Sequence, residues 1–456
     1  MSIIIAGERS GVGKTTVTLM LLAALSRRSQ KVQSFKVGPD YIDPMFHQEV
    51  TGRTCRNLDP VLTSEVYVQQ CFALHSQDAD YALIEGVMGL FDGASGLEDY
   101  ASTAHIARLL DLTVILVLDC SRLSRSVAAI AHGYSTFDPR IQIAGVVLNR
   151  VGSDRHLELL TEALTPLNLP ILGVLRRQDS ITIPDRHLGL VPTAELNNFR
   201  ALIEELAHLG ETCFNWPKLL PLLKQATRNS PLIKSPRIQN SAVHKVRVAV
   251  ARDAAFSFYY ADNPELLDRL GAELVPWSPL RDPRLPEDIQ GLYFGGGFPE
   301  VFAAELANNV QAQAQVQAQI QAGLPTYAEC GGLMYLCEQI IDFAGQTHRM
   351  VGILPSVAVM GKRLTLGYRQ AVAMQNSPFI AQGTQVWGHE FHRSELNIKP
   401  KQPLFQMQGY ATKSPKKEEG WHIYQVHASY LHVHFGAQPD IPFQFVQQCK
   451  QFAQGS

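Results

Sequence analysis

The sequence predicts an α/β protein in which two doubly wound, mostly parallel sheets occupy two domains joined by a linker. Three observations support this. Short apolar runs alternate with amphipathic segments, the alternation stops near residue 208, and it resumes near residue 245. Strands covered on both faces read as continuous apolar runs, and parallel strands need helical crossovers. A chain of 456 residues also exceeds the size at which a single core keeps growing.

The first predicted domain covers residues 1–207. Its expected strands are continuous apolar runs at 2–7, 32–38, 81–87, 113–119, 143–149 and 170–175. Two of the intervening segments have helical periodicity and are expected to be helices, at 14–28 and 124–134.

Residues 208–244 are rich in Pro, Ser and Asn and predict a linker with a loose helix at its start. The second predicted domain covers 245–456. Its expected strands are the apolar runs at 245–253, 272–278, 291–297 and 325–330. The Gln-Ala-rich segment 308–323 alternates with period two, but its residues favour a helix and the two flanking strands need a crossover.

Composition excludes several classes of protein. The net charge of −2 offers no basic field for nucleic acid. Seven scattered cysteines without a paired spacing are typical of a reducing cytosol. No apolar run is long enough to span a membrane and no leader pattern opens the chain, so we expect a cytoplasmic protein. The composition is compatible with a homo-oligomer.

The segment GERSGVGKT, residues 7–15, predicts a phosphate-binding loop for ATP. It follows an apolar run and precedes an amphipathic segment, although five residues separate Gly7 from Gly13 where the common pattern has four. Backbone N–H groups would face the phosphates, Lys14 would reach the β and γ oxygens, and the Thr15 hydroxyl would bind Mg²⁺. A plain glycine turn with a solvated lysine is the alternative. The predicted nucleotide contacts are Gly7, Gly11, Gly13, Lys14, Thr15, Thr16 and Asn149.

Polar side chains follow the next strands of the first domain. Asp40, Tyr41 and Asp43 come after the second strand and Glu85 ends the third. Ligands bind beyond the carboxyl ends of such strands, so we expect a Mg²⁺ site made by Thr15, Asp43 and Glu85. Asp40 and Asp43 can instead cap turns beside prolines. Asn149, at another strand end, can read the adenine edge or serve a turn.

A cysteine, Cys330, stands between the run PTYAE and two glycines, where a strand is expected to turn sharply into a helix over 331–340. Such a turn exposes a nucleophile and is expected to lower the pKa of its thiol. An inert buried thiol is the alternative. The segment 426–435 offers His427, His432 and His434 as candidate bases, and a metal pair of His432 and His434 is the rival interpretation. Glycine turns offer oxyanion donors at Gly296, Gly297 and Gly331.

These motifs resemble known families. ECGGLMYL, FGGGFPE and SYLHVHF are similar to class I glutamine amidotransferases. FKVGPDYIDPMFH, EGVMGLFDG and GSDRH resemble the cobyrinate a,c-diamide synthases, and the first half resembles dethiobiotin synthetase-like ATPases, which share the five-residue spacing. The resemblance implies that Cys330 is a glutaminase nucleophile and His432 its base. It also exposes a departure, because His434 stands where the glutaminases place a glutamate.

The resemblance implies a glutamine-hydrolysing carbon–nitrogen ligase. Its substrates would be ATP, L-glutamine and cobyrinate, whose a and c acetate groups would be amidated through acyl phosphates, with Asp40 and Tyr41 as substrate contacts. Sibling enzymes remain alternatives: those acting on hydrogenobyrinate or nickel-sirohydrochlorin, and cobyric acid synthase. A P-loop ATPase without amidation is a more distant one.

Overall fold

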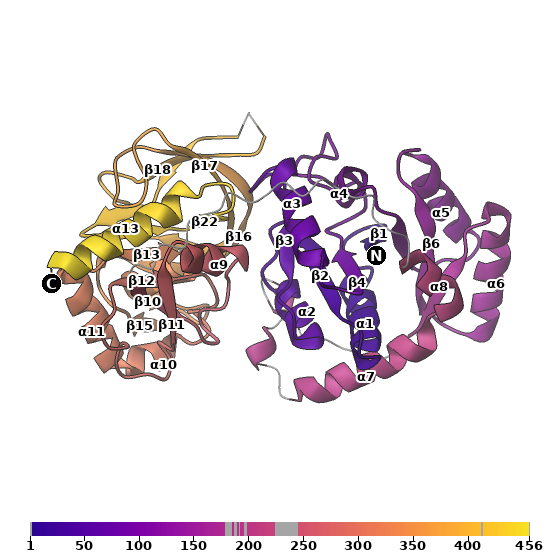
Figure 1. Ribbon diagram of the computed structural model, residues 1–456, viewed down its shortest axis with the longest axis horizontal. Helices are drawn as coiled ribbons and strands as arrows, with labels where there is room; N and C mark the ends of the chain where they lie inside the picture. Colours follow the sequence, from indigo (N-terminus) through magenta and orange to yellow (C-terminus); the bar gives the residue numbers. More distant parts are fainter. Residues whose placement is uncertain are drawn as a thin grey trace. The chain divides into compact units, whose positions relative to one another are not determined.

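The computed structural model describes residues 2–177, 185–186, 189–190, 192–195, 198–223, 245–411 and 414–455 (Figure 1). The chain forms two compact units, Met1–Lys234 and Ser235–Ser456. Each unit has its own sheets and its own clusters of buried apolar side chains. The predicted α/β class with mostly parallel sheets is confirmed.

The first unit contains a seven-stranded sheet in the order β3-β2-β4-β1-β5-β6-β7, and every neighbouring pair is parallel. All six predicted strands are present; β3 was not foreseen. The strands are β1 (Ser2–Gly7), β2 (Val32–Val37), β3 (Arg56–Leu58), β4 (Tyr81–Glu85), β5 (Val114–Asp119), β6 (Ile143–Val151) and β7 (Ile171–Arg176).

Helices cover both faces of this sheet. Ile4 and Ala6 of β1 join the apolar cluster that contains side chains of α3 and α4, and the alternate residues Ile3 and Ile5 are equally buried on the opposite face. The helices are α1 (Lys14–Arg27), α2 (Asp43–Thr51), α3 (Glu65–Ser76), α4 (Thr103–Leu110), α5 (Ser126–Thr136), α6 (Asp154–Leu164), α7 (Phe199–Cys213) and α8 (Trp216–Leu223). Two short 3₁₀ turns, η1 (Thr165–Leu167) and η2 (Thr193–Glu195), and the hairpin β8 (Asp185–Arg186) and β9 (Gly189–Leu190) complete the unit.

The segment predicted as a linker begins within α7. This helix lies against α1 so closely that a β-carbon at Gly210 would stand 2.2 Å from the Met20 carbonyl oxygen. Helix α8 packs against β1 and β7. Residues 208–223 therefore belong to the packed first unit, and residues 224–244 of the predicted linker lie outside the described residues.

The second unit contains a sheet in the order β11-β10-β12-β13-β21-β20, parallel except for its last pair. All four strands predicted for this domain are present in it. Its strands are β10 (Val246–Ala251), β11 (Ala272–Trp277), β12 (Gly291–Phe294), β13 (Thr326–Glu329), β20 (Trp421–Ile423) and β21 (Val426–Ser429).

A further sheet of the second unit, largely antiparallel, was not foreseen from the sequence. Its longest strand is mostly half-exposed and alternates in burial, so it offers no continuous apolar run. The predicted helix over 331–340 is wrong in its second half, because α12 ends at Leu336 and Cys337 begins a strand. The strands are β14 (Cys337–Ile341), β15 (Thr347–Arg349), β16 (Leu354–Ala373), β17 (Gln385–Leu396), β18 (Phe405–Gly409), β19 (Lys417–Glu419) and β22 (His432–Val433).

The Gln-Ala-rich segment forms a helix, as predicted, and it connects β12 to β13 after a short preceding helix. Ala312, Val316 and Ile320 are spaced four residues apart and are buried along one face of the helix. This burial favours a helix over the strand that the alternation with period two would suit. Helices of this unit are α9 (Asp262–Arg269), α10 (Ala303–Asn308), α11 (Val310–Gln321), α12 (Gly331–Leu336) and α13 (Asp440–Gly455). Across the described part of the chain, every helix is too short or too polar to cross a membrane.

Candidate active sites

The glycine-rich loop lies between the end of β1 and the start of α1. Strand β1 has β4 on one side and β5 on the other, so the loop stands where the strand order reverses. Gly11 and Gly13 have φ angles of 76° and 96°, which other residues rarely adopt. A β-carbon at Gly13 would also lie 2.3 Å from Asn149 Nδ2. Both glycines are therefore required by the loop itself.

Lys14 turns its ammonium back over this loop. Its Nζ donates to the carbonyl oxygens of Arg9 at 3.2 Å and Met88 at 2.5 Å. Burial, followed by the nearby charge of Lys36, lowers the pKa of Lys14 to about 8. An ammonium held only by carbonyls can exchange them for phosphate oxygens at little cost, because a charged acceptor binds it more strongly.

A pocket of about 230 Å³ adjoins the loop. It is lined by Gly13, Thr16, Met20, Asn149, Arg150, Leu175, Arg176, Arg177, Leu209 and Cys213. Asn149 braces the loop, since its Nδ2 donates to the Val12 carbonyl at 2.8 Å. Its Oδ1 accepts the Arg150 N–H at 2.9 Å. Contact of Asn149 with an adenine edge stays a prediction, and its side chain lines the pocket beside the loop.

The three residues predicted to bind Mg²⁺ converge in the structure. Thr15 Oγ1 donates to Glu85 Oε1 at 2.6 Å and lies 3.4 Å from Asp43 Oδ2. They come from the first turn of α1, the first turn of α2 and the end of β4, which the parallel register places at one edge of the sheet. Hard oxygen atoms in this number suit Mg²⁺, which completes its shell with water and phosphate. The donor set therefore fits the ion.

Lys36 also belongs to this site and was not assigned from the sequence. Its Nζ lies 2.7 Å from Asp43 Oδ2 and 2.9 Å from Glu85 Oε1. Burial by itself would lower the pKa of Lys36, but the two carboxylates raise it above its ordinary value. The sequence did contain a signal that could have identified Lys36, because a lysine inside a buried apolar strand is energetically costly unless a charged partner lies beside it.

His47 is the second residue that sequence reasoning missed. Its Nε2 lies 2.7 Å from Glu85 Oε2, and its Nδ1 lies 3.4 Å from Cys55 Sγ. Burial would lower the pKa of His47, but the contacts with Cys55 and Glu85 raise it to about 10. Burial likewise opposes ionisation of Glu85, and Lys36 and His47 together lower the pKa of Glu85 below its usual value. Glu85 is thus a buried carboxylate with cationic partners on both oxygens.

One of the two predicted substrate contacts, Asp40, caps a turn. Asp40 Oδ1 accepts the N–H groups of Ile42 at 2.8 Å and Asp43 at 3.0 Å, which is the turn-capping alternative. Tyr41 is buried. The Asp40 cap places Asp43 at the start of α2, so it contributes indirectly to the carboxylate cluster.

Cys330 stands at a sharp turn between β13 and α12, as predicted. Its backbone has φ 48° and ψ −99°, a conformation that a residue with a β-carbon adopts only under strain. The Cys330 N–H donates to the Ser429 carbonyl at 2.7 Å, and Gly332 N–H donates to the Gly295 carbonyl at 3.0 Å. Backbone bonds on both sides therefore hold the strained turn, as in other nucleophile elbows.

The expectation of a lowered thiol pKa is wrong for this state. Burial raises the pKa of Cys330 well above its ordinary value, and the charges of Glu300, Glu329 and Glu390 add to the rise, while a backbone hydrogen bond from Gly331 opposes it. A thiolate at Cys330 therefore needs a partner that takes its proton. Cys337 is fully buried in the apolar cluster, as expected of a core residue.

The predicted oxyanion glycines lie together beside the turn. A β-carbon at Gly296 would stand 2.3 Å from His432 Cε1, and one at Gly331 would stand 3.0 Å from Gly297 N. The Gly296 N–H donates to the Phe258 carbonyl at 3.3 Å and is used by the fold. Gly297 and Gly331 are the better candidates for oxyanion donors, and the absence of side chains lets the histidine approach this segment.

His432 is buried and neutral. Burial, followed by the charges of His389 and His392, lowers the pKa of His432 to about 3, so the imidazole is neutral near neutral pH and needs a stabilising partner when it takes a proton. It pairs with His389 across β22 and β17. The metal-pair interpretation finds no support in the part of the chain described: His434 Nε2 lies 3.2 Å from Asp262 Oδ2, whereas His432 Nδ1 lies 3.8 Å from Glu329 Oε2.

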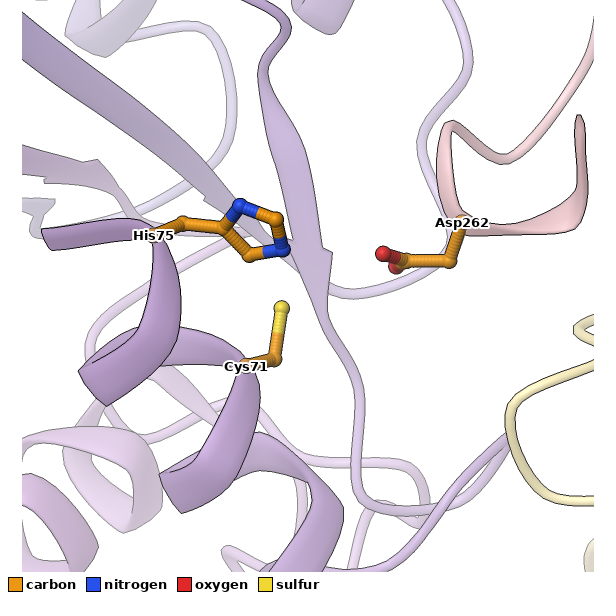
Figure 2. A group of neighbouring side chains, drawn as sticks. All are labelled: Cys71, His75 and Asp262. Carbon is orange, nitrogen blue, oxygen red and sulfur yellow. The ribbon is translucent and has the colours of Figure 1, made fainter. Parts of the chain in front are cut away.

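One other group has side chains that often bind metals. Figure 2 shows Cys71 and His75, which lie one turn apart on α3 of the first unit, and Asp262, which opens α9 of the second. Cys71 belongs to the apolar cluster of its own unit, and Asp262 pairs with His434 within its own. Because the three residues belong to different units, we assign no metal site to them.

Both units match known protein families. Residues 3–191 match the CobQ/CobB/MinD/ParA nucleotide binding domain, and residues 247–440 match the CobB/CobQ-like glutamine amidotransferase domain. The first match contains the loop, the carboxylate cluster and Lys36. The second contains Cys330, the glycine segment and His432.

Curated relatives extend over nearly the whole chain. The protein is 61% identical over 451 residues to a cobyrinate a,c-diamide synthase of Synechococcus sp., with 99% of each chain covered. It is 53% identical to the enzyme of that name from Synechocystis sp., covering 99% of this chain and 94% of the relative. A hydrogenobyrinate a,c-diamide synthase of Streptomyces coelicolor is 43% identical, covering 98% of this chain and 97% of the relative. With this identity across both domains, the chain belongs to the cobyrinate a,c-diamide synthase family.

Proposed function

We propose that the protein is a glutamine-hydrolysing ligase that uses ATP to convert the a and c acetate groups of cobyrinate to amides. The observation that carries the proposal is the pairing of two sites in one chain: a phosphate loop with converging carboxylates, and a cysteine on a strained elbow beside the glycine segment that a buried histidine contacts. Each is half of the chemistry that amide synthesis from glutamine requires.

In the first unit, a substrate carboxylate attacks the γ-phosphorus of ATP. The bond to the β,γ-bridging oxygen breaks, and ADP and an acyl phosphate form. Lys14 exchanges its hydrogen bonds with the carbonyls of Arg9 and Met88 for hydrogen bonds with the β- and γ-phosphate oxygens. Lys36 supplies a second positive charge at the carboxylate cluster. Thr15, Asp43 and Glu85 would hold Mg²⁺, which supplies charge neutralisation on the phosphate oxygens. Asp40 Oδ2 and Tyr41 are the proposed substrate contacts.

In the second unit, His432 takes the proton of Cys330 as the sulfur attacks the side-chain amide of glutamine. The carbon–nitrogen bond breaks, His432 returns the proton to the leaving nitrogen, and ammonia and a thioester result. Water then cleaves the thioester to glutamate. Gly297 and Gly331 are the proposed donors to the oxyanion.

Ammonia attacks the carbonyl carbon of the acyl phosphate, loses a proton, and displaces inorganic phosphate to form the amide. One ATP and one glutamine are consumed for each amide. Two rounds complete the product.

Mass analysis of cobyrinate incubated with the protein, ATP, Mg²⁺ and glutamine tests the proposal. The expected product carries two amides, with two glutamates and two phosphates released. Four amides would indicate a cobyric acid synthase, and no change in cobyrinate would contradict the proposed substrate. A parallel incubation with hydrogenobyrinate tests the second candidate, which the Streptomyces coelicolor relative favours by its name.

A further inference from the structure

The residue two positions after the candidate base is His434 rather than the expected glutamate, and the structure shows which contacts it makes. In class I glutaminases a glutamate two residues after the histidine is expected, but here His434 pairs with Asp262 at 3.2 Å and lies against the ring of Tyr260 at 5.0 Å between centroids. His434 also accepts the Gly436 N–H at 3.2 Å on Nδ1. It is thus engaged away from His432.

A different carboxylate stands beside His432. Glu329 Oε2 lies 3.8 Å from His432 Nδ1, and both side chains are almost fully buried. Glu329 is the last residue of β13 and directly precedes the cysteine of the elbow, so the turn that orients the sulfur also orients the carboxylate. Glu390, which also raises the pKa of His432, is itself held by Arg369 at 2.6 Å and lies 3.3 Å from His392.

The second oxygen of Glu329 is anchored. Oε1 accepts the Val433 N–H at 3.0 Å and the Tyr327 hydroxyl at 3.1 Å. Val433 follows His432 in β22, so this bond ties the carboxylate to the strand that carries the histidine. The acid is fixed by two donors on one oxygen, and its other oxygen lies at ion-pair distance from Nδ1, on the side of the base where a nucleophile–base–acid triad has its orienting acid.

We propose that Glu329 is the positioning acid of the glutaminase site, replacing the glutamate absent at residue 434 and stabilising the imidazolium that forms on His432. This proposal rests on the proposed glutaminase function of Cys330 and His432. It places the acid and the nucleophile at adjacent residues of the chain, on the strand and the elbow that follows it.

Burial dominates the electrostatics of both side chains. Burial raises the pKa of Glu329 to about 8 and lowers that of His432, so each group alone resists becoming charged. A positive charge on His432 and a negative charge on Glu329 stabilise each other in the same buried space. The charged and titratable groups that face His432 are Glu329 of β13 and His389, Glu390 and His392 of β17.

The test uses the full chain with Glu329→Gln, which keeps the shape and an acceptor oxygen but removes the negative charge. We expect kcat of glutamine-dependent synthesis to fall roughly 10²-fold, KM for glutamine to change less than about threefold, and ammonia-dependent synthesis to stay within about twofold. Removing the anion makes the imidazolium less stable, so the acid limb of the glutamine-dependent pH profile should move to lower pH. Glu329→Asp should restore part of kcat.

Glu419→Gln is the matched control. Glu419 is another buried carboxylate of the second unit, it accepts the Tyr430 N–H at 3.2 Å and the Ser429 hydroxyl, and burial raises its pKa to about 7. Glu419→Gln should lose about as much stability as Glu329→Gln. The acid limb of its glutamine-dependent pH profile should not shift, and its kcat should stay within about threefold of the wild type.

Three results would overturn the role of Glu329: unchanged kcat and pH profile, a rise in KM alone, or an acid limb that moves equally in Glu419→Gln. If Glu329→Gln fails to fold, the profile of Glu329→Asp decides, and an unshifted acid limb with full kcat refutes the proposal. Failure of the glutaminase function itself would look different, because Cys330→Ala would then keep glutamine-dependent synthesis.

Discussion

The two candidate sites have opposite electrostatic designs. In the phosphate-loop site, buried charges are paired before any ligand arrives: Lys36 contacts Asp43 and Glu85, and Glu85 also contacts His47. In the glutaminase site, Cys330 and His432 are both held in their neutral forms by burial. The phosphate-loop site therefore contains paired charged groups, whereas the glutaminase site contains neutral groups that become charged only when a proton is transferred.

This difference suits the ligands proposed for each site. ATP and Mg²⁺ are highly charged, so fixed ammonium and carboxylate groups that exchange partners cost less than groups that must first ionise. Glutamine offers a neutral amide, and a thiol that stays protonated without substrate is protected from wasteful reaction. The lesson is that buried titratable groups in one chain can be tuned in opposite directions by the presence or absence of a paired charge.

The largest expected effect tests the charged site. Lys14→Ala should lower synthesis with glutamine and with ammonia alike, by roughly 10³-fold, because the phosphate contact is needed whichever nitrogen donor is used. Product formation followed by mass analysis is the measurement. Lys31→Ala, at an exposed lysine of the same unit, should leave both rates unchanged. Full activity of Lys14→Ala would show that the loop is not the ATP site.

The second effect separates the two sites. Cys330→Ala should abolish glutamine-dependent synthesis but keep ammonia-dependent synthesis within about twofold, since only one site loses its nucleophile. Initial rates with each donor measure this. Cys337→Ala removes a neighbouring buried thiol and should cost stability only. Loss of both activities in Cys330→Ala at normal stability would refute the division of labour.

A smaller effect tests the support of Glu85. His47→Gln removes a cationic partner of this carboxylate, and we expect the Mg²⁺ concentration for half-maximal ammonia-dependent synthesis to rise roughly tenfold. A Mg²⁺ titration measures it. His105→Gln, which removes contacts with Glu65, the Ala101 N–H and the Tyr100 ring but none with Glu85, should show the wild-type midpoint. An unchanged midpoint in His47→Gln would show that Glu85 needs no such support.

The smallest effect concerns stability and pH. Burial lowers the pKa of His427 to about 3, below the unfolded value near 6.5, so its contribution is present above pH 6.5 and is lost as pH falls toward 3. Between pH 6.5 and 3 the free energy of unfolding of His427→Gln should fall less steeply with decreasing pH than that of the wild type. The two slopes should differ by up to about 1.4 kcal/mol per pH unit. His47 has the opposite sign: its raised pKa stabilises below pH 6.5, and this is lost toward pH 10.

Urea unfolding of His427→Gln and the wild type at several pH values between 4 and 7 makes this comparison. Parallel slopes in the two proteins would contradict the assignment of a buried neutral histidine at this position.

Much of this architecture could be predicted because its signals are local. Continuous apolar runs predict strands buried on both faces, and glycines between a strand and a helix predict a phosphate loop, since both depend on a few adjacent residues. The turn at Cys330 was predictable for the same reason. The convergence of Thr15, Asp43 and Glu85 also followed from the sequence, because parallel strands end at a common edge.

Other features depend on partners distant in the chain, and only the tertiary structure decided them. The largely antiparallel sheet has half-exposed strands without a continuous apolar signal. Lys36 becomes part of the charged site through contacts with Asp43 and Glu85, and His47 through its contact with Glu85. The pKa of Cys330 rises because the fold buries the sulfur among carboxylates, against the local expectation from its turn. Sequence determines which groups are present and where strands end, whereas burial and charge pairing, which set their chemistry, arise when distant segments pack together.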